Sequence, residues 1–346
     1  MKLNRKYLLN LLIIGVITVA VMYFSLKDSF GEAVAAFKRM NLASIVLILC
    51  WGLLFTAAWG VSYKFLGQKY KKNYSLTEGI IVAMVGTFFA GITPSSTGGQ
   101  FGQIYVLKKQ GISMNNGASL LWADFIIYQT TMMIYVTILF ALKFKEYLAQ
   151  SNWFLIVFAG YLINFAVIAG LYTLALFPKA YVKLATWLAK ALSKFKFVKE
   201  PEAMVSKWTD QMEQFTSEVR ALSQDKKIIV KCMAANFVRL TMLYSLPYVI
   251  ALAFGIKLDS GALLDTLALS SFVTMANSFI PLPGASGGTE LVFAMMFKSM
   301  LGKLTGAVLL LWRISSYYLP MIVGAIVFIV FKSHHDQKSE ELKTAS

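Results

Sequence analysis

The sequence predicts an all-α polytopic membrane protein with six full spans and two re-entrant helical hairpins arranged in two inverted repeats. The first observation is compositional: 58% of the 346 residues are hydrophobic and 14% are charged. The hydrophobic residues come in runs of about 20 or more, which is long enough to cross a bilayer.

The second observation is that two apolar stretches are interrupted by polar, Gly-rich breaks, Thr93–Gln100 and Pro283–Thr289. Both breaks follow the pattern Pro-x-x-(Ser/Thr)-Gly-Gly, 189 residues apart. Irregular backbone inside a membrane is tolerated where protein or a cavity covers it. Paired breaks of this kind are typical of transporters.

The composition also disfavours several classes of protein. Lys and Arg outnumber Asp and Glu by 33 to 17, but these cations lie in short loops beside apolar spans. There they set membrane topology, so we expect no nucleic-acid partner. Cys50 and Cys232 fall within apolar spans and His334 and His335 in a polar tail, so neither a disulfide nor a metal site is expected. No nucleotide-binding or nucleophile motif occurs, and we expect no cofactor.

The chain divides into six predicted segments. Residues 1–41 hold the first span and an external loop, 42–142 form repeat one, and 143–177 form a linking span. Residues 178–227 are predicted to be basic amphipathic helices in the cytoplasm, 228–332 form repeat two, and 333–346 are a cytoplasmic tail. The predicted spans are Tyr7–Leu26, Leu42–Leu66, Gly117–Leu142, Trp153–Phe177, Ile228–Phe254 and Leu304–Phe331.

The first broken element has two arms, Gly79–Ile92 and Phe101–Leu107, that are roughly 21 Å and 11 Å long as helices. Neither arm can cross a hydrocarbon layer of about 30 Å. If the element crossed as a whole, Lys108, Lys109 and the basic segment 178–227 would face outward. If it dips in and returns, these cations stay inside, and the positive-inside rule favours this topology. The second broken element, within Ala262–Met300, then enters from the external side, and both termini are cytoplasmic in the cell membrane.

Charged side chains deep in a membrane are costly, and each is therefore a candidate for a functional site. The 189-residue offset places Asp124 on Arg313 and Tyr128 on Tyr317. The acid and the base either face one central cavity and bind a substrate, or form a buried pair that locks two spans together. The deep ionisable residues are Asp124, Arg239, Glu290 and Arg313.

The two breaks supply further candidate groups. Gly98-Gly99 and Gly287-Gly288 are predicted to open short helices, whose free N–H groups favour anions such as phosphate. The arginines would suit a lipid phosphodiester, and Asp124 and Glu290 a cationic headgroup. Alternatively, Glu290 only stabilises the start of its own helix. Neutral hydrogen-bonding candidates are Thr97, Gln100, Gln103, Ser286 and Thr289.

The motifs resemble those of a known family. Thr93–Gln100, followed by Tyr105–Ser113, is similar to the first motif of the lysylphosphatidylglycerol synthase transmembrane (flippase) family, and Ile280–Glu290 is similar to the second. The resemblance extends over roughly spans one to six. It implies a flippase that moves lipids between leaflets, in the best-known members aminoacylated phosphatidylglycerol, which confers resistance to cationic antimicrobial peptides. Those members also carry a C-terminal cytosolic aminoacyltransferase domain, which we do not expect in a chain that ends at Ser346.

The sequence therefore predicts a non-enzymatic lipid flippase with a membrane lipid as its substrate. The partners considered are a second copy of the chain and a separate lipid-synthesising enzyme. Two other classes stay open: a secondary transporter of small solutes or ions, and a membrane-embedded lipid-modifying enzyme. The same inverted architecture would serve either of them.

Overall fold

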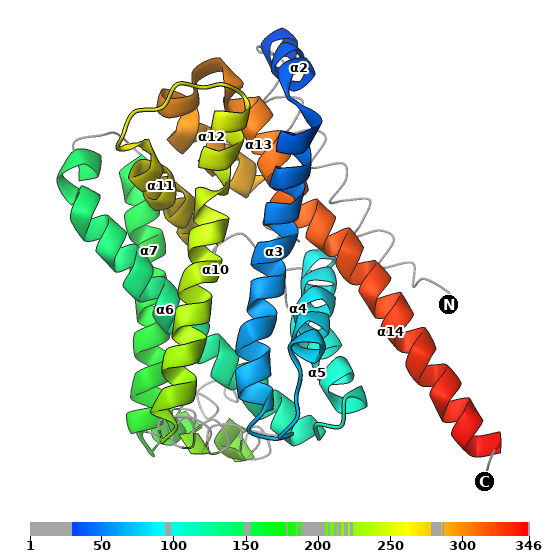
Figure 1. Ribbon diagram of the computed structural model, residues 1–346. Helices are drawn as coiled ribbons and strands as arrows, with labels where there is room; N and C mark the ends of the chain where they lie inside the picture. The colour runs from blue at the N-terminus through cyan, green and yellow to red at the C-terminus, as the bar shows by residue number, and fades with distance from the viewer. Residues whose placement is uncertain are drawn as a thin grey trace, which may run out of the picture.

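The computed structural model is an elongated bundle of helices (Figure 1). It describes residues 30–93, 98–148, 153–177, 179–184, 186–187, a few positions between 205 and 221, 224–277, 285 and 287–344. All secondary structure within these ranges is helical, and the all-α polytopic class is confirmed. The predicted span Tyr7–Leu26 lies outside the described residues, as do most of the predicted amphipathic helices between 178 and 227.

The long helices follow the predicted spans closely. Of the described helices, those long and apolar enough to cross a membrane are Leu42–Gly67, Met114–Lys143, Lys226–Ala253 and the run Gly288–His335. The predicted span at Trp153–Phe177 is a helix over Trp153–Leu176, of which Phe158–Leu174 counts among the shorter apolar helices. The total of six spans therefore stays a prediction.

In chain order the elements are α2 (Phe30–Arg39), α3 (Leu42–Gly67), α4 (Leu76–Gly91), α5 (Gly98–Lys109), α6 (Met114–Leu148), α7 (Trp153–Leu176), α10 (Lys226–Ala253), α11 (Ala262–Asn277), α12 (Gly288–Leu301), η3 (Gly302–Leu304), α13 (Thr305–Arg313), η4 (Ile314–Tyr318) and α14 (Leu319–Thr344).

The first hairpin consists of α4 and α5 and occupies the lower half of the bundle (Figure 1). Its entry is fixed by a capping box, in which Ser75 Oγ accepts from the Glu78 N–H at 3.1 Å and Glu78 Oε2 accepts from the Ser75 N–H at 2.7 Å. Lys71 Nζ lies 2.6 Å from Glu78 Oε1 and also donates to the Gln110 carbonyl at 3.0 Å. The loops before and after the hairpin are thus tied together at its base.

The second hairpin, α11 and α12, occupies the upper half of the bundle (Figure 1). It follows α10, which rises from the lower end, whereas the first hairpin follows the descending α3. The two hairpins therefore enter from opposite ends, as an inverted arrangement requires. The exact boundaries of the predicted repeats stay a prediction.

Helix α4 packs unusually close to its neighbours because glycines line the contacts. A Cβ on Gly79 would lie 2.3 Å from the Gly60 carbonyl oxygen, and one on Gly60 would lie 2.6 Å from the Ile80 nitrogen. On the other side of α4, a Cβ on Gly324 would lie 2.2 Å from the Met84 carbonyl oxygen. Small residues that let backbones approach are how helices pack in membranes, where lipid competes with apolar side chains. The first hairpin is thus held between α3 and α14.

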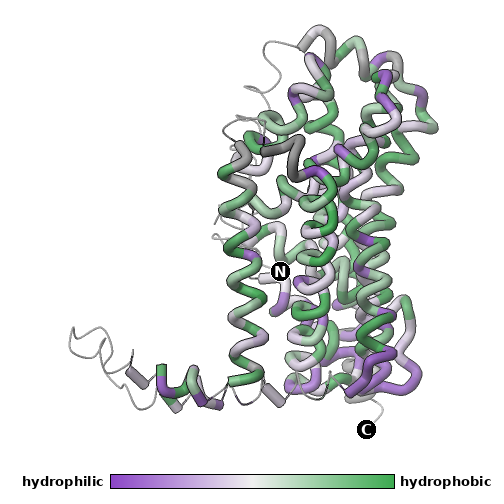
Figure 2. The backbone as a smooth tube through the Cα atoms, turned by 90° about the vertical axis from the view of Figure 1, so that its left-hand side faces the viewer, coloured by the Kyte–Doolittle hydropathy of each residue, from purple (hydrophilic) through white to green (hydrophobic). Residues whose placement is uncertain are grey.

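The buried apolar residues form two clusters, one around each hairpin. The lower cluster includes Tyr63 of α3, Val82 of α4 and Val106 of α5. The upper cluster includes Phe272 of α11 and Phe293 of α12. Hydrophilic residues gather at the lower end, while the helices between the ends are mostly hydrophobic (Figure 2). Each hairpin is therefore built into its own part of the core.

Candidate functional site

The lower candidate site, called here the Arg239 cluster, comprises Trp59, Tyr63, Gln103, Asp124, Tyr128 and Arg239. Its residues come from four helices: α3, α5, α6 and α10. Asp124 is the eleventh residue of α6 and Arg239 the fourteenth of α10, so both lie about 15–20 Å along their helices. That depth places the cluster well inside the predicted hydrocarbon layer.

The Asp124 carboxylate is buried, with 4% of the residue exposed. Its Oδ2 accepts a hydrogen bond from Trp59 Nε1 at 2.9 Å, and the Tyr63 side chain lies close enough to interact with the carboxylate. The Tyr63 hydroxyl in turn accepts from Gln103 Nε2 at 2.7 Å, which connects Asp124 to the first hairpin. Asp124 Oδ1 is buried without a hydrogen-bond partner among the described residues. A buried polar atom of this kind is costly and calls for an explanation.

Arg239 is half-buried and lies between two aromatic rings. Its guanidinium carbon is 4.2 Å from the centroid of the Trp59 ring and 5.1 Å from that of Tyr128. In the part of the chain that the structure describes, no carboxylate forms an ion pair with Arg239. Two cation–π contacts compensate a desolvated charge in part, since each contributes about 0.5–2 kcal/mol. Much of the hydrogen-bonding capacity of the guanidinium remains for a ligand.

Trp59 explains why Asp124 and Arg239 do not meet. Its indole N–H bonds the carboxylate, while its ring face lies against the guanidinium. The two charges are close enough to interact electrostatically, but they are held on different parts of one indole. A cation and an anion are thus kept side by side without neutralising each other by direct contact.

The upper candidate site is a closed ion pair between Glu290 of α12 and Arg313 of α13. Arg313 Nε lies 2.8 Å from Glu290 Oε1, and the two side chains are 5% and 0% exposed. Glu290 Oε2 also accepts from the Gly287 N–H at 2.6 Å, so the carboxylate both caps α12 and binds the arginine. The carboxylate thus lies at the start of its own helix, where the local interpretation of Glu290 places it. Thr289, also buried, donates its hydroxyl to the Ala285 carbonyl at 2.9 Å.

Asp124 and Arg313 do not form the buried pair that was one interpretation of the 189-residue offset. Arg313 contacts Glu290, whereas Asp124 accepts a hydrogen bond from Trp59. The offset relates equivalent positions of two repeats, and equivalent positions need not be neighbours in space. Whether both residues face one cavity, the other interpretation, stays a prediction.

Tyr317 connects the upper site to the first hairpin. The Arg313 guanidinium carbon lies 4.4 Å from the centroid of the Tyr317 ring, and the Tyr317 hydroxyl donates to the Gly91 carbonyl at 2.8 Å. Gly91 is the last residue of α4. Tyr317 belongs to η4, a π-helical turn, and such turns are frequent at functional sites.

The N–H groups at the Gly-Gly pairs are less free than the sequence predicts. Helices α5 and α12 do begin at Gly98 and Gly288. However, the Gly98 N–H donates to Thr93 Oγ1 at 2.8 Å, and the Gly287 N–H donates to Glu290. These two donors are already used within the chain, so neither is available to an anion in this structure.

The structure thus divides the predicted site residues between two places. Asp124, Tyr128, Arg239 and Gln103 lie in the lower cluster, and Glu290, Arg313 and Tyr317 in the upper one. Gln100 is exposed, and Thr97 and Ser286 lie outside the described residues. Sequence reasoning missed Trp59 and Tyr63 of the lower cluster, and Tyr318 of the upper site, whose ring centroid lies 5.8 Å from the Arg313 guanidinium carbon. A signal existed for the first two: they are aromatic residues with polar tips, four apart on one helix, and hence on one face.

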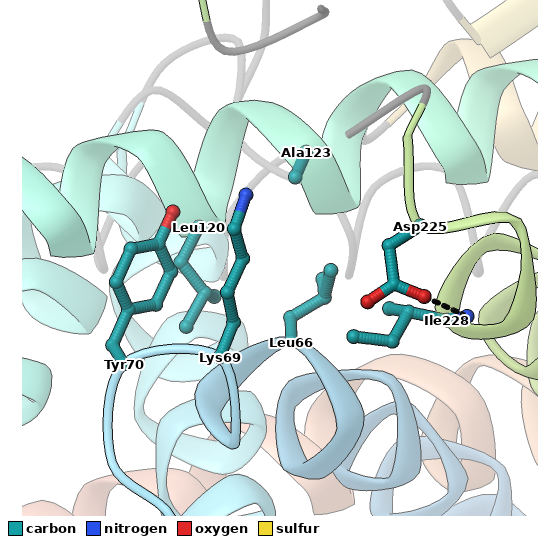
Figure 3. Close-up of a pocket in the computed structure, with 7 residues that line it drawn as sticks. All are labelled: Leu66, Lys69, Tyr70, Leu120, Ala123, Asp225 and Ile228. Atoms are coloured by element: carbon teal, nitrogen blue, oxygen red, sulfur yellow. Dashed lines mark hydrogen bonds between the residues drawn. The ribbon is translucent and has the colours of Figure 1, made fainter. Parts of the chain in front are cut away.

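A pocket lies near the lower ends of α3, α6 and α10 (Figure 3). It is lined by Leu66, Lys69, Tyr70, Leu120, Ala123, Asp225 and Ile228. Asp225 caps α10 by accepting from the Ile228 N–H at 3.2 Å. Ala123 precedes Asp124 directly in the chain, but no residue of the Arg239 cluster lines this pocket.

Comparison with known proteins places the chain in a family. Residues 7–324 match the family described as the lysylphosphatidylglycerol synthase TM region. A UPF0104 membrane protein of Archaeoglobus fulgidus is 25% identical over 323 residues, which cover 90% of this chain and 93% of the relative. An uncharacterized MG306 homologue of Mycoplasma pneumoniae is 23% identical over 343 residues, covering 91% of this chain and 85% of the relative. No solved structure matches significantly. The chain is therefore a multi-pass membrane protein that belongs to the lysylphosphatidylglycerol synthase transmembrane-region family.

Proposed function

We propose that this protein is a lipid flippase, which moves a headgroup-bearing phospholipid or glycolipid between the leaflets of the cell membrane. The observation that carries the proposal is Arg239: a half-buried guanidinium at membrane depth, with aromatic rings beside it and no ion-pair partner among the described residues. Such a charge costs several kcal/mol in a bilayer, which a functional partner would offset.

A lipid phosphodiester suits this site for chemical reasons. A guanidinium offers parallel N–H donors that bind phosphate oxygens in a bidentate manner. The Trp59 and Tyr128 rings add apolar faces, which suit the glycerol and acyl portions of a lipid better than a hydrated ion. Membership of a family named after a phospholipid synthase is compatible with such a substrate. Aminoacyl-phosphatidylglycerol is one member of this class, and the site does not require an aminoacyl group.

The two hairpins supply a route for alternating access. They enter from opposite ends, and Tyr317 connects the pair Glu290–Arg313 to the end of α4. A movement of one hairpin would therefore change the contacts of the other. An inverted arrangement of broken helices around a midplane site is the general basis of alternating access.

Leaflet exchange in proteoliposomes tests the proposal. Purified protein is reconstituted with fluorescent phosphatidylglycerol, phosphatidylethanolamine or a glycolipid, and a membrane-impermeant quencher reports the fraction in the outer leaflet. We expect at least one lipid to exchange faster than in protein-free liposomes. Arg239→Gln should slow that exchange roughly 10- to 100-fold, because a hydrogen bond to a charged group contributes about 1.5–3 kcal/mol.

The matched control is Lys231→Gln, which removes an exposed cation from the same helix. It should exchange lipid at the wild-type rate. Exchange no faster than in empty liposomes for all three lipids would contradict the proposal. So would a folded Arg239→Gln protein with the wild-type rate, whereas uptake of a soluble solute instead would favour the carrier interpretation.

A further inference from the structure

We propose that Asp124 is a proton-binding site, and that it takes up a proton when an anionic phosphodiester lipid binds at Arg239. This inference rests on the proposed function, because it concerns the same cluster. It adds what drives transport: a proton moves together with the lipid anion.

One carboxylate oxygen of Asp124 lacks a hydrogen-bond partner among the described residues. Oδ2 is engaged by Trp59 and Oδ1 has no hydrogen-bond partner among the described residues, although the residue is 4% exposed. A buried carboxylate that lacks part of its hydrogen bonding is a poor place for a full negative charge. The opposing influence is Arg239, whose positive charge stabilises the ionised form through space. The charge state of Asp124 therefore depends on what else binds Arg239.

A bound phosphodiester and the Asp124 carboxylate would compete for Arg239. A phosphodiester that binds the guanidinium brings a second negative charge next to Asp124. Two anions would then share one cation in a low-dielectric site, and like charges at close range disfavour double ionisation. Protonation of Asp124 removes this repulsion and restores a net charge near zero. Binding of the lipid anion and of the proton should therefore assist each other, and the coupling is reciprocal.

The other groups around Asp124 leave it as the proton acceptor. Among the described residues, the titratable or charged side chains facing it are Tyr63 of α3, Tyr128 of α6 itself, and Arg239 and Cys232 of α10. Helix α5 contributes the uncharged amide of Gln103 through Tyr63. A tyrosine hydroxyl, a thiol and a guanidinium ordinarily hold their protons at neutral pH, so none of them can take up another. The carboxylate is the remaining acceptor in the cluster.

A proton would have to reach Asp124 from an end of the bundle, and the lower end is the side on which a pocket lies. The pocket in Figure 3 opens between the ends of α3, α6 and α10 and is lined by Ala123, the chain neighbour of Asp124. Lys69 and Asp225 supply polar groups there. A proton that reaches Oδ1 needs no redox partner: water at that face supplies it and the carboxylate accepts it.

The decisive measurement is proton uptake on lipid binding. Wild-type protein in detergent is titrated with short-chain phosphatidylglycerol by calorimetry in buffers of different ionisation enthalpy. We expect uptake of close to one proton per lipid bound wherever Asp124 starts ionised. The affinity should then fall about tenfold per unit rise in pH over that range. Lipid binding with no proton uptake at any pH, or no binding of this probe at any pH, would overturn the inference.

Variants assign the proton to its site. Asp124→Asn keeps an acceptor for Trp59 but cannot ionise, so it should bind the lipid with an affinity that no longer varies with pH. Asp259→Asn, an exposed acid in the loop between α10 and α11, should retain the wild-type pH dependence. An unchanged pH dependence in folded Asp124→Asn protein would refute the assignment. If Asp124→Asn does not fold, the wild-type proton count alone still decides.

Leaflet exchange separates this inference from the proposed function. If both the proposed function and this inference are correct, wild-type exchange of phosphatidylglycerol should depend on pH. A pH gradient across the membrane should then bias the lipid toward one leaflet. Exchange that depends on neither the pH nor a pH gradient would overturn proton coupling, but it would still support the proposed flippase function. Absence of exchange for every lipid would instead overturn the flippase assignment.

Discussion

The two buried charge sites of this protein use similar residues in opposite ways. In the upper site, Glu290 and Arg313 are in direct contact at 2.8 Å and almost fully buried, and Glu290 is further held by the Gly287 N–H. In the lower site, Asp124 and Arg239 contact different parts of the Trp59 indole and form no ion pair with each other, and Arg239 is half-buried. A closed ion pair has satisfied its own charges and serves the fold. An arginine held open beside an acid remains available to a ligand.

This difference teaches that depth and charge alone do not identify a transport site. All four ionisable residues meet the usual criterion of an intramembrane charge. The criterion that separates them is whether the protein itself places an opposite charge in direct contact, as it does for Glu290 and Arg313. By that criterion we propose a mainly structural role for Glu290 and Arg313, and a substrate-binding role for the Arg239 cluster.

The largest expected effect concerns the opposite entry of the two hairpins, on which the comparison of upper and lower sites depends. In a background without Cys50 and Cys232, single cysteines at Asn115 and Ser260 should react with an impermeant reagent from opposite sides of the membrane. Both positions are exposed, after the first hairpin and before the second. Asn115 should be labelled from the cytoplasmic side. Labelling of both from one side would remove the inverted arrangement.

The next effect is on stability, and it contrasts the two acids. Glu290→Gln leaves Arg313 buried beside an uncharged partner and should lower the free energy of unfolding by about 3–5 kcal/mol. Asp124→Asn should cost only about 1 kcal/mol, because the amide oxygen can still accept from Trp59. Thermal unfolding of the purified proteins, followed by intrinsic fluorescence, measures both. Equal losses in the two variants would contradict the division into a closed and an open site.

A smaller effect should separate the two contacts of Trp59. Trp59→Phe removes the donor to Asp124 but keeps a ring for Arg239, and should cost about 1 kcal/mol of stability. Trp59→Leu removes the ring as well and should cost about 0.5–1 kcal/mol more. Only the leucine variant should also weaken lipid exchange strongly, because Arg239 would lose its position. If the two variants behave alike, the indole does not hold Arg239 in place.

The smallest effect lies outside the spans, at the base of the first hairpin. Partial burial tends to raise the pKa of Glu78, but the hydrogen bonds from Lys71 and Ser75 outweigh it and lower the pKa below its usual value. A carboxyl group with a lowered pKa stabilises the fold above its unfolded-state pKa, and this contribution is lost as the pH falls through the folded-state pKa. The loss should stay below about 1 kcal/mol, because Lys71 is 40% exposed and solvent screens the pair.

Thermal unfolding between neutral and acidic pH measures this contribution. The wild type should lose more stability on acidification than Lys71→Met, which has already lost the ion pair. Lys72→Met removes an exposed neighbouring cation and should follow the wild type. An identical acid response in Lys71→Met and the wild type would show that the pair does not contribute.

The sequence by itself determined the class of the protein and the places where its helices break. Apolar runs separated by basic loops predicted long helices at Leu42–Leu66, Gly117–Leu142 and Ile228–Phe254, each of which the structure has within a few residues. These features are local in the chain, because length, hydrophobicity and helix-breaking residues act on neighbouring positions. The candidate charges could also be named, since any ionisable group in an apolar run stands out.

Only the tertiary structure decided which charge meets which partner. Glu290 meets Arg313, Tyr317 reaches Gly91, and Arg239 lies between Trp59 and Tyr128. Several of these contacts join residues far apart in the chain, such as the 226 positions between Gly91 and Tyr317. They depend on how each helix is rotated about its axis and on how closely the glycines of α3, α4 and α14 let the backbones approach. Neither quantity is written in a hydrophobic pattern, because a pattern marks the buried face of a helix but not the side chain that it will face there.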